Sequence, residues 1–212
     1  MVIARAAAGL FVRHGLRATR AEDIAQSAGI APRTFYRYFA TKEEAVAPLY
    51  AAGAERWAEA VRAAPPALSV PEALEHGVRH TLTPGVGVSM NSWTWLRPLI
   101  GLAESSPALR RVWAEVCQTS ERTLGEVLAE RITKGDTTLA GRPLPVTSPQ
   151  LRFAAAVASA AVRTAVEGWA SGEAEGEKEG GSAAGPAELA LRNLRALRSF
   201  PWAELGAARG AL

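Results

Sequence analysis

Residues 19–44 read TRAEDIAQSAGIAPRTFYRYFATKEE, and this stretch decides the fold of the N-terminal part of the chain. Two short segments within it, 20–28 and 32–39, carry apolar residues at helical spacing. Gly29 lies between them, and glycine accepts the left-handed conformation that ends many helices. Pro32 suits the first turn of the second helix, where its missing N–H would be unpaired anyway. The pattern predicts two helices joined by a tight turn, which is a helix-turn-helix unit.

Two T-x-x-E sequences mark predicted helix starts. Thr19 and Glu22 stand at the start of the first short helix, and Thr41 and Glu44 stand at the start of a longer helix that follows the unit. In such a capping box the threonine oxygen and the glutamate carboxylate each accept a free backbone N–H. Both pairs are therefore predicted to bind the backbone locally.

The rest of the chain is also helical in pattern, with no convincing period-two strand. Pro48 falls inside the longer helix, where the hydrogen bond that it cannot make is expected to kink the helix. Another interruption is expected near Pro98. The prediction is an all-α fold of about nine helices, at residues 2–14, 19–28, 32–39, 41–63, 69–82, 88–100, 106–133, 148–170 and 187–200.

Composition excludes several classes of protein. The chain has 212 residues and one Cys, so no intramolecular disulfide can form. Its longest apolar run, residues 153–162, is far shorter than the roughly 18 residues of a membrane span. The first residues, MVIARAAAGLFVRHG, do not resemble a signal peptide. These features predict a cytoplasmic protein without a membrane segment.

The formal net charge of +3 lies entirely in the first quarter of the chain. Residues 1–50 contain seven Lys and Arg against four Asp and Glu, whereas residues 51–212 contain equal numbers of each sign. A basic, aromatic-containing segment attached to a neutral one indicates a polyanion-binding module joined to a second domain.

The N-terminal motifs closely resemble the DNA-binding domain of TetR-type bacterial transcriptional regulators. They are I-A-x-x-A-G-I at 24–30, T-F-Y-x-Y-F at 34–39 and T-K-E at 41–43, preceded by A-x-x-L-F-x-x-x-G at 7–15. The resemblance covers about the first 50 residues, and the remainder agrees in length and helical character. It implies a three-helix helix-turn-helix domain at 1–47 and a helical effector-binding and dimerisation domain at 48–212. Residues 171–186, SGEAEGEKEGGSAAGP, are predicted to be a disordered loop in that second domain.

The candidate DNA contacts follow from the motif and from side-chain chemistry. Apolar residues of the unit are expected to form its core, which leaves polar and aromatic side chains outside. The predicted core residues are Ile24, Ala25, Ala28, Ile30, Phe35 and Phe39. The resemblance implies DNA contacts at Thr34, Tyr36, Tyr38 and Lys42, with the tyrosine hydroxyls on phosphates. Arginine forks suit guanine edges, and basic side chains at helix starts suit phosphates. The full set is Arg20, Arg33, Thr34, Tyr36, Arg37, Tyr38 and Lys42.

Aromatic residues mixed with polar ones in the second domain are candidates for a pocket that binds an apolar or aromatic effector. Plain core packing is the alternative for each tryptophan. The candidate residues are Met90, Asn91, Trp93, Trp95, Trp113, Cys117 and Glu121.

Two other patterns in this domain bear on metal binding and dimerisation. Glu72, His76 and His80 share one helix face, but a straight row closes poorly on one metal ion, so no metal site and no cofactor are predicted. Small residues at 153–166 and leucines at 189–197 are expected to form a dimer interface, with burial inside one chain as the alternative.

The function expected from these features is that of a homodimeric regulator without enzymatic activity. It would bind a palindromic DNA operator as a repressor and release it when a small-molecule effector binds. One alternative is a helical enzyme or carrier for small molecules in which the helix-turn-helix is an accessory. Another is a regulator without an effector, which would lack a usable cavity.

Overall fold

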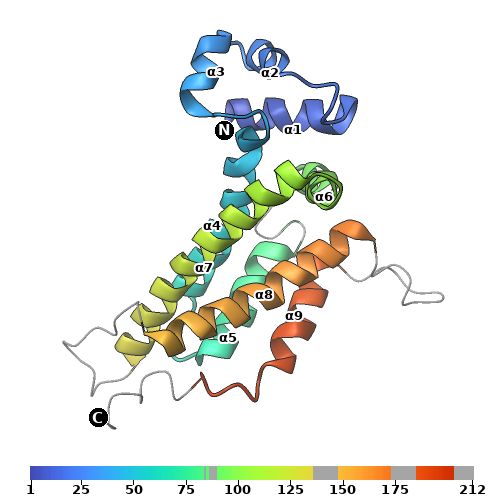
Figure 1. The fold of residues 1–212 in the computed structure, drawn as a ribbon. Helices are drawn as coiled ribbons and strands as arrows, with labels where there is room; N and C mark the ends of the chain where they lie inside the picture. The colour runs from blue at the N-terminus through green and yellow to red at the C-terminus, as the bar shows by residue number, and fades with distance from the viewer. Residues whose placement is uncertain (84, 86–89, 136–147, 173–184, 203–212) are drawn as a thin grey trace, which may run out of the picture. The chain divides into compact units, whose positions relative to one another are not determined.

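All regular elements in the described part of the chain are helices, which confirms the predicted all-α class. The computed structural model describes residues 1–83, 85, 90–135, 148–172 and 185–202, the side chains of 90–95 and 135 excepted. Among these residues, no helix combines the length and hydropathy that a membrane span requires. Figure 1 shows the elements in chain order: α1 (Val2–His14), α2 (Ala21–Ser27), α3 (Pro32–Tyr38), the 3-10 helix η1 (Glu43–Val46), α4 (Ala47–Ala63), α5 (Val70–Leu82), α6 (Met90–Ser105), α7 (Pro107–Gly135), α8 (Pro149–Ser171) and α9 (Pro186–Ala196).

The chain forms two compact units. The first comprises Met1–Gly53 and Ser89–Val116, and the second comprises Ala54–Val88 and Cys117–Leu212. The boundaries fall inside α4 and α7, so each of these helices has residues in both units. Most of the loop predicted at 171–186 lies outside the described residues.

The first predicted capping box, Thr19 with Glu22, is wrong in its residues. Thr19 is buried, and its hydroxyl donates to the Gly15 carbonyl at 2.9 Å instead of serving α2. The N-cap is Arg20, whose backbone N–H donates to the Asp23 carboxylate at 2.8 Å. The box is therefore displaced by one residue, because the threonine hydroxyl is turned inward to hold the loop after α1. Glu22 is consequently not used at this helix start.

The second capping box holds in part. The N–H of Glu44 donates to the Thr41 hydroxyl at 3.3 Å, but the Glu44 carboxylate accepts the N–H of Ala40, at 2.9 Å, rather than that of Thr41. These bonds fix the start of η1, a single 3-10 turn that leads into α4.

The kink predicted at Pro48 is wrong, because Pro48 is the second residue of α4 and not in its interior. In the preceding 3-10 turn, the N–H of Ala47 donates to the Glu44 carbonyl. In an α-helix, the N–H of residue 48 would bond to this same Glu44 carbonyl. The carbonyl therefore has a donor although proline lacks an N–H. Proline costs little in a first turn, since its missing N–H has no helical partner there.

Pro98 also fails to interrupt its helix, since α6 continues through it to Ser105. Its side chain is exposed, whereas the next two residues, Leu99 and Ile100, are buried. Burial of these two side chains favours a helix that continues past the proline, as tertiary contacts often override local preference.

In the second unit, α9 packs against both α8 and α5. The small side chains of α8 predicted to lie between two copies are mostly buried inside one chain, as are two of the leucines of α9. Burial within the chain, the alternative reading, therefore holds for these residues: Ala154, Ala155, Ala158, Ala161, Ala165, Leu189 and Leu194.

Close helix packing in the second unit requires a glycine on α5. A Cβ added at Gly77 would lie 2.7 Å from Cγ2 of Val61 and 3.0 Å from Cδ1 of Trp57. Val61 is fully buried and Trp57 is 7% exposed, so neither side chain has free space to move into. The absence of a side chain at position 77 allows α5 to pack directly on this part of α4.

Two glycine-to-alanine substitutions are expected to have effects of opposite sign. Gly77→Ala should lower the free energy of unfolding by about 1–2 kcal/mol, because overpacking outweighs the better helix propensity of alanine. Gly53→Ala on α4 should raise it by about 0.5–1 kcal/mol, since a Cβ there meets nothing within 4 Å. Urea unfolding followed by circular dichroism measures both changes. Two changes of the same sign would contradict the packing described for Gly77.

Candidate nucleic-acid interface

The turn between α2 and α3 has the geometry that its sequence predicts. Gly29 has a φ of +69°, in the left-handed region that favours glycine. The N–H of Ile30 donates to the Ala25 carbonyl at 2.9 Å, which closes the end of α2. Pro32 then occupies the first turn of α3. The two helices are thereby joined by a short turn that is bonded to the end of α2.

Burial divides the helix-turn-helix into an inner and an outer face. Ile24, Ala25 and Phe35 are completely buried and anchor the two helices. Three further predicted core residues, Ala28, Ile30 and Phe39, are half-buried. On the outer face of α3 the predicted contact residues are exposed, except for a half-buried Thr34: Arg33, Tyr36, Arg37 and Tyr38.

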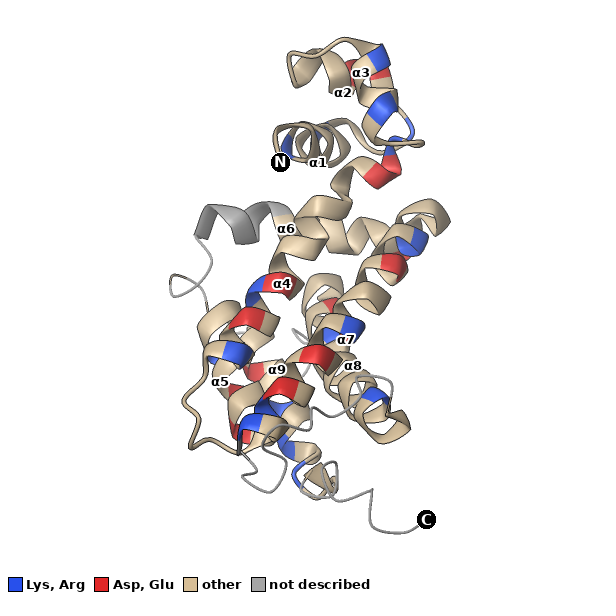
Figure 2. Ribbon diagram, turned by 90° about the vertical axis from the view of Figure 1, so that its left-hand side faces the viewer, with Lys and Arg blue, Asp and Glu red and all other residues tan. Residues whose placement is uncertain are grey.

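A hydrogen bond joins the outer faces of α2 and α3. The Tyr36 hydroxyl donates to Oε1 of Glu22 at 3.3 Å, and Nε of Arg20 lies 3.6 Å from Oε2 of the same carboxylate. Partial desolvation raises the pKa of Tyr36, and the Glu22 charge and hydrogen bond raise it further. Figure 2 shows the acidic residues of α2 beside the basic residues of α3.

Arg37 and Tyr38 form a second pair on the exposed face. Nη2 of Arg37 donates to the Tyr38 hydroxyl at 3.3 Å, and the guanidinium carbon lies 5.1 Å from the centre of the Tyr38 ring. Tyr38 is 61% exposed, so this contact leaves both groups accessible to a ligand. The stacked arrangement restricts the Arg37 side chain before any ligand arrives.

Lys42 has a structural partner that its motif does not reveal. Its ammonium donates to the carbonyls of Leu16 and Thr19, at 2.7 and 2.8 Å, in the loop between α1 and α2. An ammonium has three N–H groups, and these are the two bonds that it makes within the described residues. The remaining N–H leaves a phosphate contact possible, while the other two hold the loop.

The fold and the exposed face of α3 define a helix-turn-helix protein. Residues 3–47 match the family model described as bacterial regulatory proteins, tetR family. The match confirms the resemblance stated from the motifs and identifies this N-terminal segment as a TetR-family domain. A comparison with curated protein sequences gave no match.

A solved structure of a TetR-family protein shares the fold. The TetR family repressor AlkX from Dietzia sp., implicated in biodegradation of n-alkanes, is 19% identical, with a TM-score of 0.53 over 93% of this chain and 94% of that chain. TetR-family regulators from Mesorhizobium loti and Marinobacter aquaeolei are 21% and 17% identical, with TM-scores of 0.48 and 0.42 over 92% and 91% of both chains, respectively. At such identity the likeness to AlkX concerns the fold. Together, the family match and the fold support a DNA-binding transcriptional regulator.

The predicted effector residues fall into different parts of the molecule. The side chains of Met90, Asn91, Trp93 and Trp95 lie outside the described residues. Trp113, in the first unit, makes an edge-to-face contact with the Tyr50 ring at a centroid distance of 5.0 Å. Cys117 and Glu121 belong to the second unit, on α7.

Charged side chains of α7 and α8 act on the half-buried Cys117 thiol. Burial raises the pKa of the Cys117 thiol to about 12, and the charges of Arg163, Glu167 and Glu121 are close enough to influence it. The thiol is therefore protonated at neutral pH and is not an activated nucleophile. Reasoning from sequence missed Arg163 and Glu167, although their separation of four residues on a helix is a recognisable ion-pair spacing.

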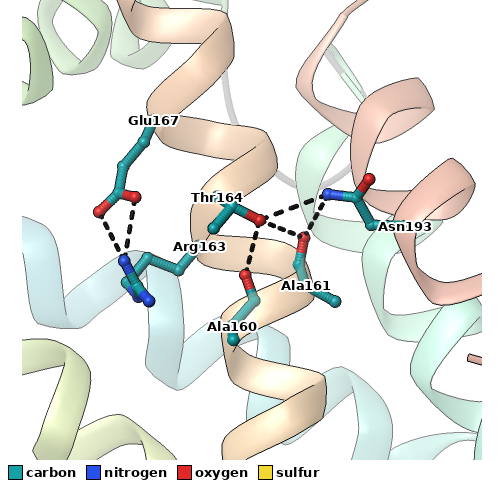
Figure 3. Close-up of polar contacts among 6 residues, drawn as sticks. All are labelled: Ala160, Ala161, Arg163, Thr164, Glu167 and Asn193. Atoms are coloured by element: carbon teal, nitrogen blue, oxygen red, sulfur yellow. Dashed lines mark hydrogen bonds and ion pairs between the residues drawn. The ribbon is translucent and has the colours of Figure 1, made fainter.

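The two sides of α8 have different polar contacts, as Figure 3 shows. On one side Nη1 of Arg163 donates to both carboxylate oxygens of Glu167, at 3.2 and 3.0 Å. On the other side Nδ2 of Asn193, from α9, donates to the Ala161 carbonyl at 2.9 Å and to the Thr164 hydroxyl at 3.4 Å. The attachment to α9 thus leaves the Arg163–Glu167 pair on the opposite side of the helix.

Glu72, His76 and His80, which share one face of α5, make contacts other than metal coordination. The Glu72 carboxylate accepts the backbone N–H and the hydroxyl of Ser69, at 2.8 and 2.6 Å, at the helix start. The rings of His76 and His80 are stacked with centroids 6.4 Å apart. No group of three or more potential metal-binding side chains is found among the described residues.

Proposed function

We propose that the chain is a sequence-specific DNA-binding repressor that releases its operator when a small-molecule effector binds, and that it is not an enzyme. The observation that carries this proposal is α3, a short helix anchored by the buried Phe35, with exposed arginines and tyrosines on its outer face. A major groove about 12 Å wide admits one such helix. AlkX is described as a repressor, and on that basis we propose repression and not activation for this chain.

The side chains of this face suit two different roles. Tyrosine hydroxyls and the ammonium of Lys42 are donors for phosphates, which position a protein on DNA without reading its sequence. Arginine forks match the two acceptors of guanine in the major groove. Arg33 is exposed and makes no hydrogen bond or ion pair within the described part of the chain, so its fork is free for a base. Arg37 is the second candidate for a base contact.

We propose a homodimer, because two recognition helices about one DNA turn apart read a palindrome. The interface then consists of apolar side chains that packing within one chain leaves accessible. Phe153 on α8 is 61% exposed, and Val157 and Leu191 are half-buried on α8 and α9. Sedimentation analysis of wild-type protein and of the Phe153→Glu variant tests this, and the variant is expected to sediment as a monomer. A wild-type monomer would contradict the dimer.

The effector is proposed to be apolar or aromatic, with polar groups on α7 and α8 that direct it. Cys117 and Glu121 are the described members of the candidate pocket within the second unit, and we add Arg163 and Glu167 because their charges act on the Cys117 thiol. The response is proposed to reach the first unit along α4 or α7, since both helices have residues in both units.

Selection of genomic fragments by the purified full-length protein tests the proposal. A regulator should enrich one palindromic sequence, and its affinity should fall with salt. With roughly four phosphate contacts in each protomer, a dimer is expected to show a log–log slope near −7. A small-molecule enzyme or carrier would form no specific DNA complex, and that outcome would contradict the proposed function.

Arg33→Ala is expected to relax base preference at one position of each half-site. A lost guanine contact costs about 1–3 kcal/mol of discrimination, whereas binding to random duplex should change little. Lys42→Ala is the matched comparison, and it should weaken operator and random duplex alike. Fluorescence anisotropy with both duplexes measures the difference. Equal loss on both duplexes for Arg33→Ala would assign that side chain to the backbone instead.

A further inference from the structure

The proposed DNA-binding surface contains a carboxylate among its cationic and hydroxyl groups. Glu22 accepts the Tyr36 hydroxyl at 3.3 Å and lies 3.6 Å from Nε of Arg20. Both partners belong to the candidate DNA contacts. The Arg20 and Glu22 side chains are 77% and 46% exposed, and Tyr36 is 52% exposed, so the group is open to a ligand in solution.

Glu22 is not required for the fold of α2. The N-cap bond of this helix is made by Asp23, whose carboxylate accepts the N–H of Arg20 at 2.8 Å. The other predicted capping residue, Thr19, bonds to Gly15 instead. Within the described part of the chain, the partners of the Glu22 carboxylate are the exposed side chains of Arg20 and Tyr36. The two helices of the motif are held together by buried side chains such as Ile24 and Phe35.

A carboxylate in this position opposes DNA binding. An exposed ion pair contributes little to stability. A DNA phosphate can therefore replace the Glu22 carboxylate as the partner of Arg20 and of the Tyr36 hydroxyl. The Glu22 charge nevertheless stays beside the incoming phosphate. Two like charges about 6 Å apart in a water-like dielectric change an equilibrium by about threefold.

We infer that Glu22 restrains DNA binding: its carboxylate occupies Tyr36 and Arg20 in the free protein and yields them to a phosphate when DNA binds. The inference rests on the proposed function. Glu22 is then a positioning residue that sets operator affinity below the value that the basic residues alone would give. It also lowers the salt dependence, because in the free protein Arg20 is neutralised by Glu22 instead of by solvent ions.

The Glu22→Gln variant tests the inference, since glutamine keeps the shape of the side chain and removes its charge. The variant should bind operator about threefold more tightly per half-site, or about tenfold as a dimer. Its log–log salt slope should steepen by about one for each half-site, because Arg20 then neutralises a phosphate in full. The melting temperature should remain that of wild type, since Asp23 still provides the N-cap bond. Glu126→Gln on α7 makes the same change of net charge outside the helix-turn-helix and should leave affinity unchanged.

The Tyr36→Phe substitution, made in wild type and in Glu22→Gln, shows whether the carboxylate and DNA compete for the Tyr36 hydroxyl. Loss of the hydroxyl should weaken DNA binding more in Glu22→Gln than in wild type, because in wild type the Glu22 carboxylate competes for it. Unchanged or weaker operator binding by Glu22→Gln would overturn the inference. If no operator is recovered, the proposed function fails on its own. Binding to random duplex then tests the role of Glu22: the Glu22→Gln variant should still bind random duplex more tightly than wild type does.

Discussion

Phe35→Ala is expected to lower the free energy of unfolding by about 3–5 kcal/mol and to abolish operator binding. Phe35 has no exposed surface, and its ring contacts those of Tyr36 and Phe39, each at a centroid distance of 5.5 Å. Helix α3 has seven residues, which is too few to be stable alone in water. Its position therefore depends on this buried ring. Urea unfolding followed by circular dichroism measures the stability change.

The exposed neighbour of Phe35 provides the matched control. Tyr36 is 52% exposed, so Tyr36→Ala should cost less than about 1 kcal/mol of stability while it removes a proposed DNA contact. Anisotropy titrations with operator DNA should then show weaker binding for a folded protein. Full operator affinity in the Phe35→Ala variant would show that α3 is positioned by other contacts.

Arg131→Ala is expected to lower the free energy of unfolding by about 3 kcal/mol. The guanidinium on α7 donates to four backbone carbonyls at the end of α4 and in the loop that follows. Burial lowers the pKa of Arg131, but an arginine remains charged at any ordinary pH. The four acceptors are the carbonyls of Val61, Ala64, Pro65 and Leu68, at 3.2, 2.8, 3.0 and 3.1 Å.

The size of this effect follows from the number of bonds and their partial exposure. A hydrogen bond to a charged group contributes about 1.5–3 kcal/mol when buried, and water replaces part of that at a half-buried site. Arg131→Lys should recover less than half, because an ammonium lacks the planar fork that spans several acceptors.

Arg62→Ala is the matched control for Arg131→Ala. Arg62 makes exposed ion pairs with Glu59 and Glu130, so its loss should cost less than about 1 kcal/mol. Equal losses for Arg62→Ala and Arg131→Ala in urea unfolding would contradict the role given to the four carbonyl bonds.

The helical class and the division of α3 into an inner and an outer face were predictable from the sequence. Both follow from the spacing of apolar residues, which reports directly on burial. Phe35 is buried and Tyr36 and Tyr38 are exposed, as their spacing predicts. The positive φ of Gly29 was also predictable, because glycine lacks a Cβ and accepts the left-handed conformation at the end of a helix. The division at residues 47 and 48 and the DNA contacts stay predictions.

Local rules failed where a side chain had a choice of partners. Thr19 fits a capping box in sequence, but in the fold its hydroxyl reaches the Gly15 carbonyl. Pro48 reads as a helix interruption, but a 3-10 turn places the helix start immediately before it. The Thr19 hydroxyl bonds to a carbonyl that the folded chain places beside it, and the 3-10 turn supplies the Glu44 carbonyl with the N–H of Ala47 in place of the one that Pro48 lacks. Neither pairing is specified by the local motif.

The sequence by itself determined the helices, the turn of the helix-turn-helix and the identity of the side chains on its outer face, because these depend on residues a few positions apart. Only the tertiary structure decided which distant groups meet. Glu22 and Tyr36 are 14 residues apart, and Arg131 lies 63 to 70 residues from the carbonyls that it binds. Such contacts depend on how helices pack, and packing is a property of the whole chain that no short pattern contains.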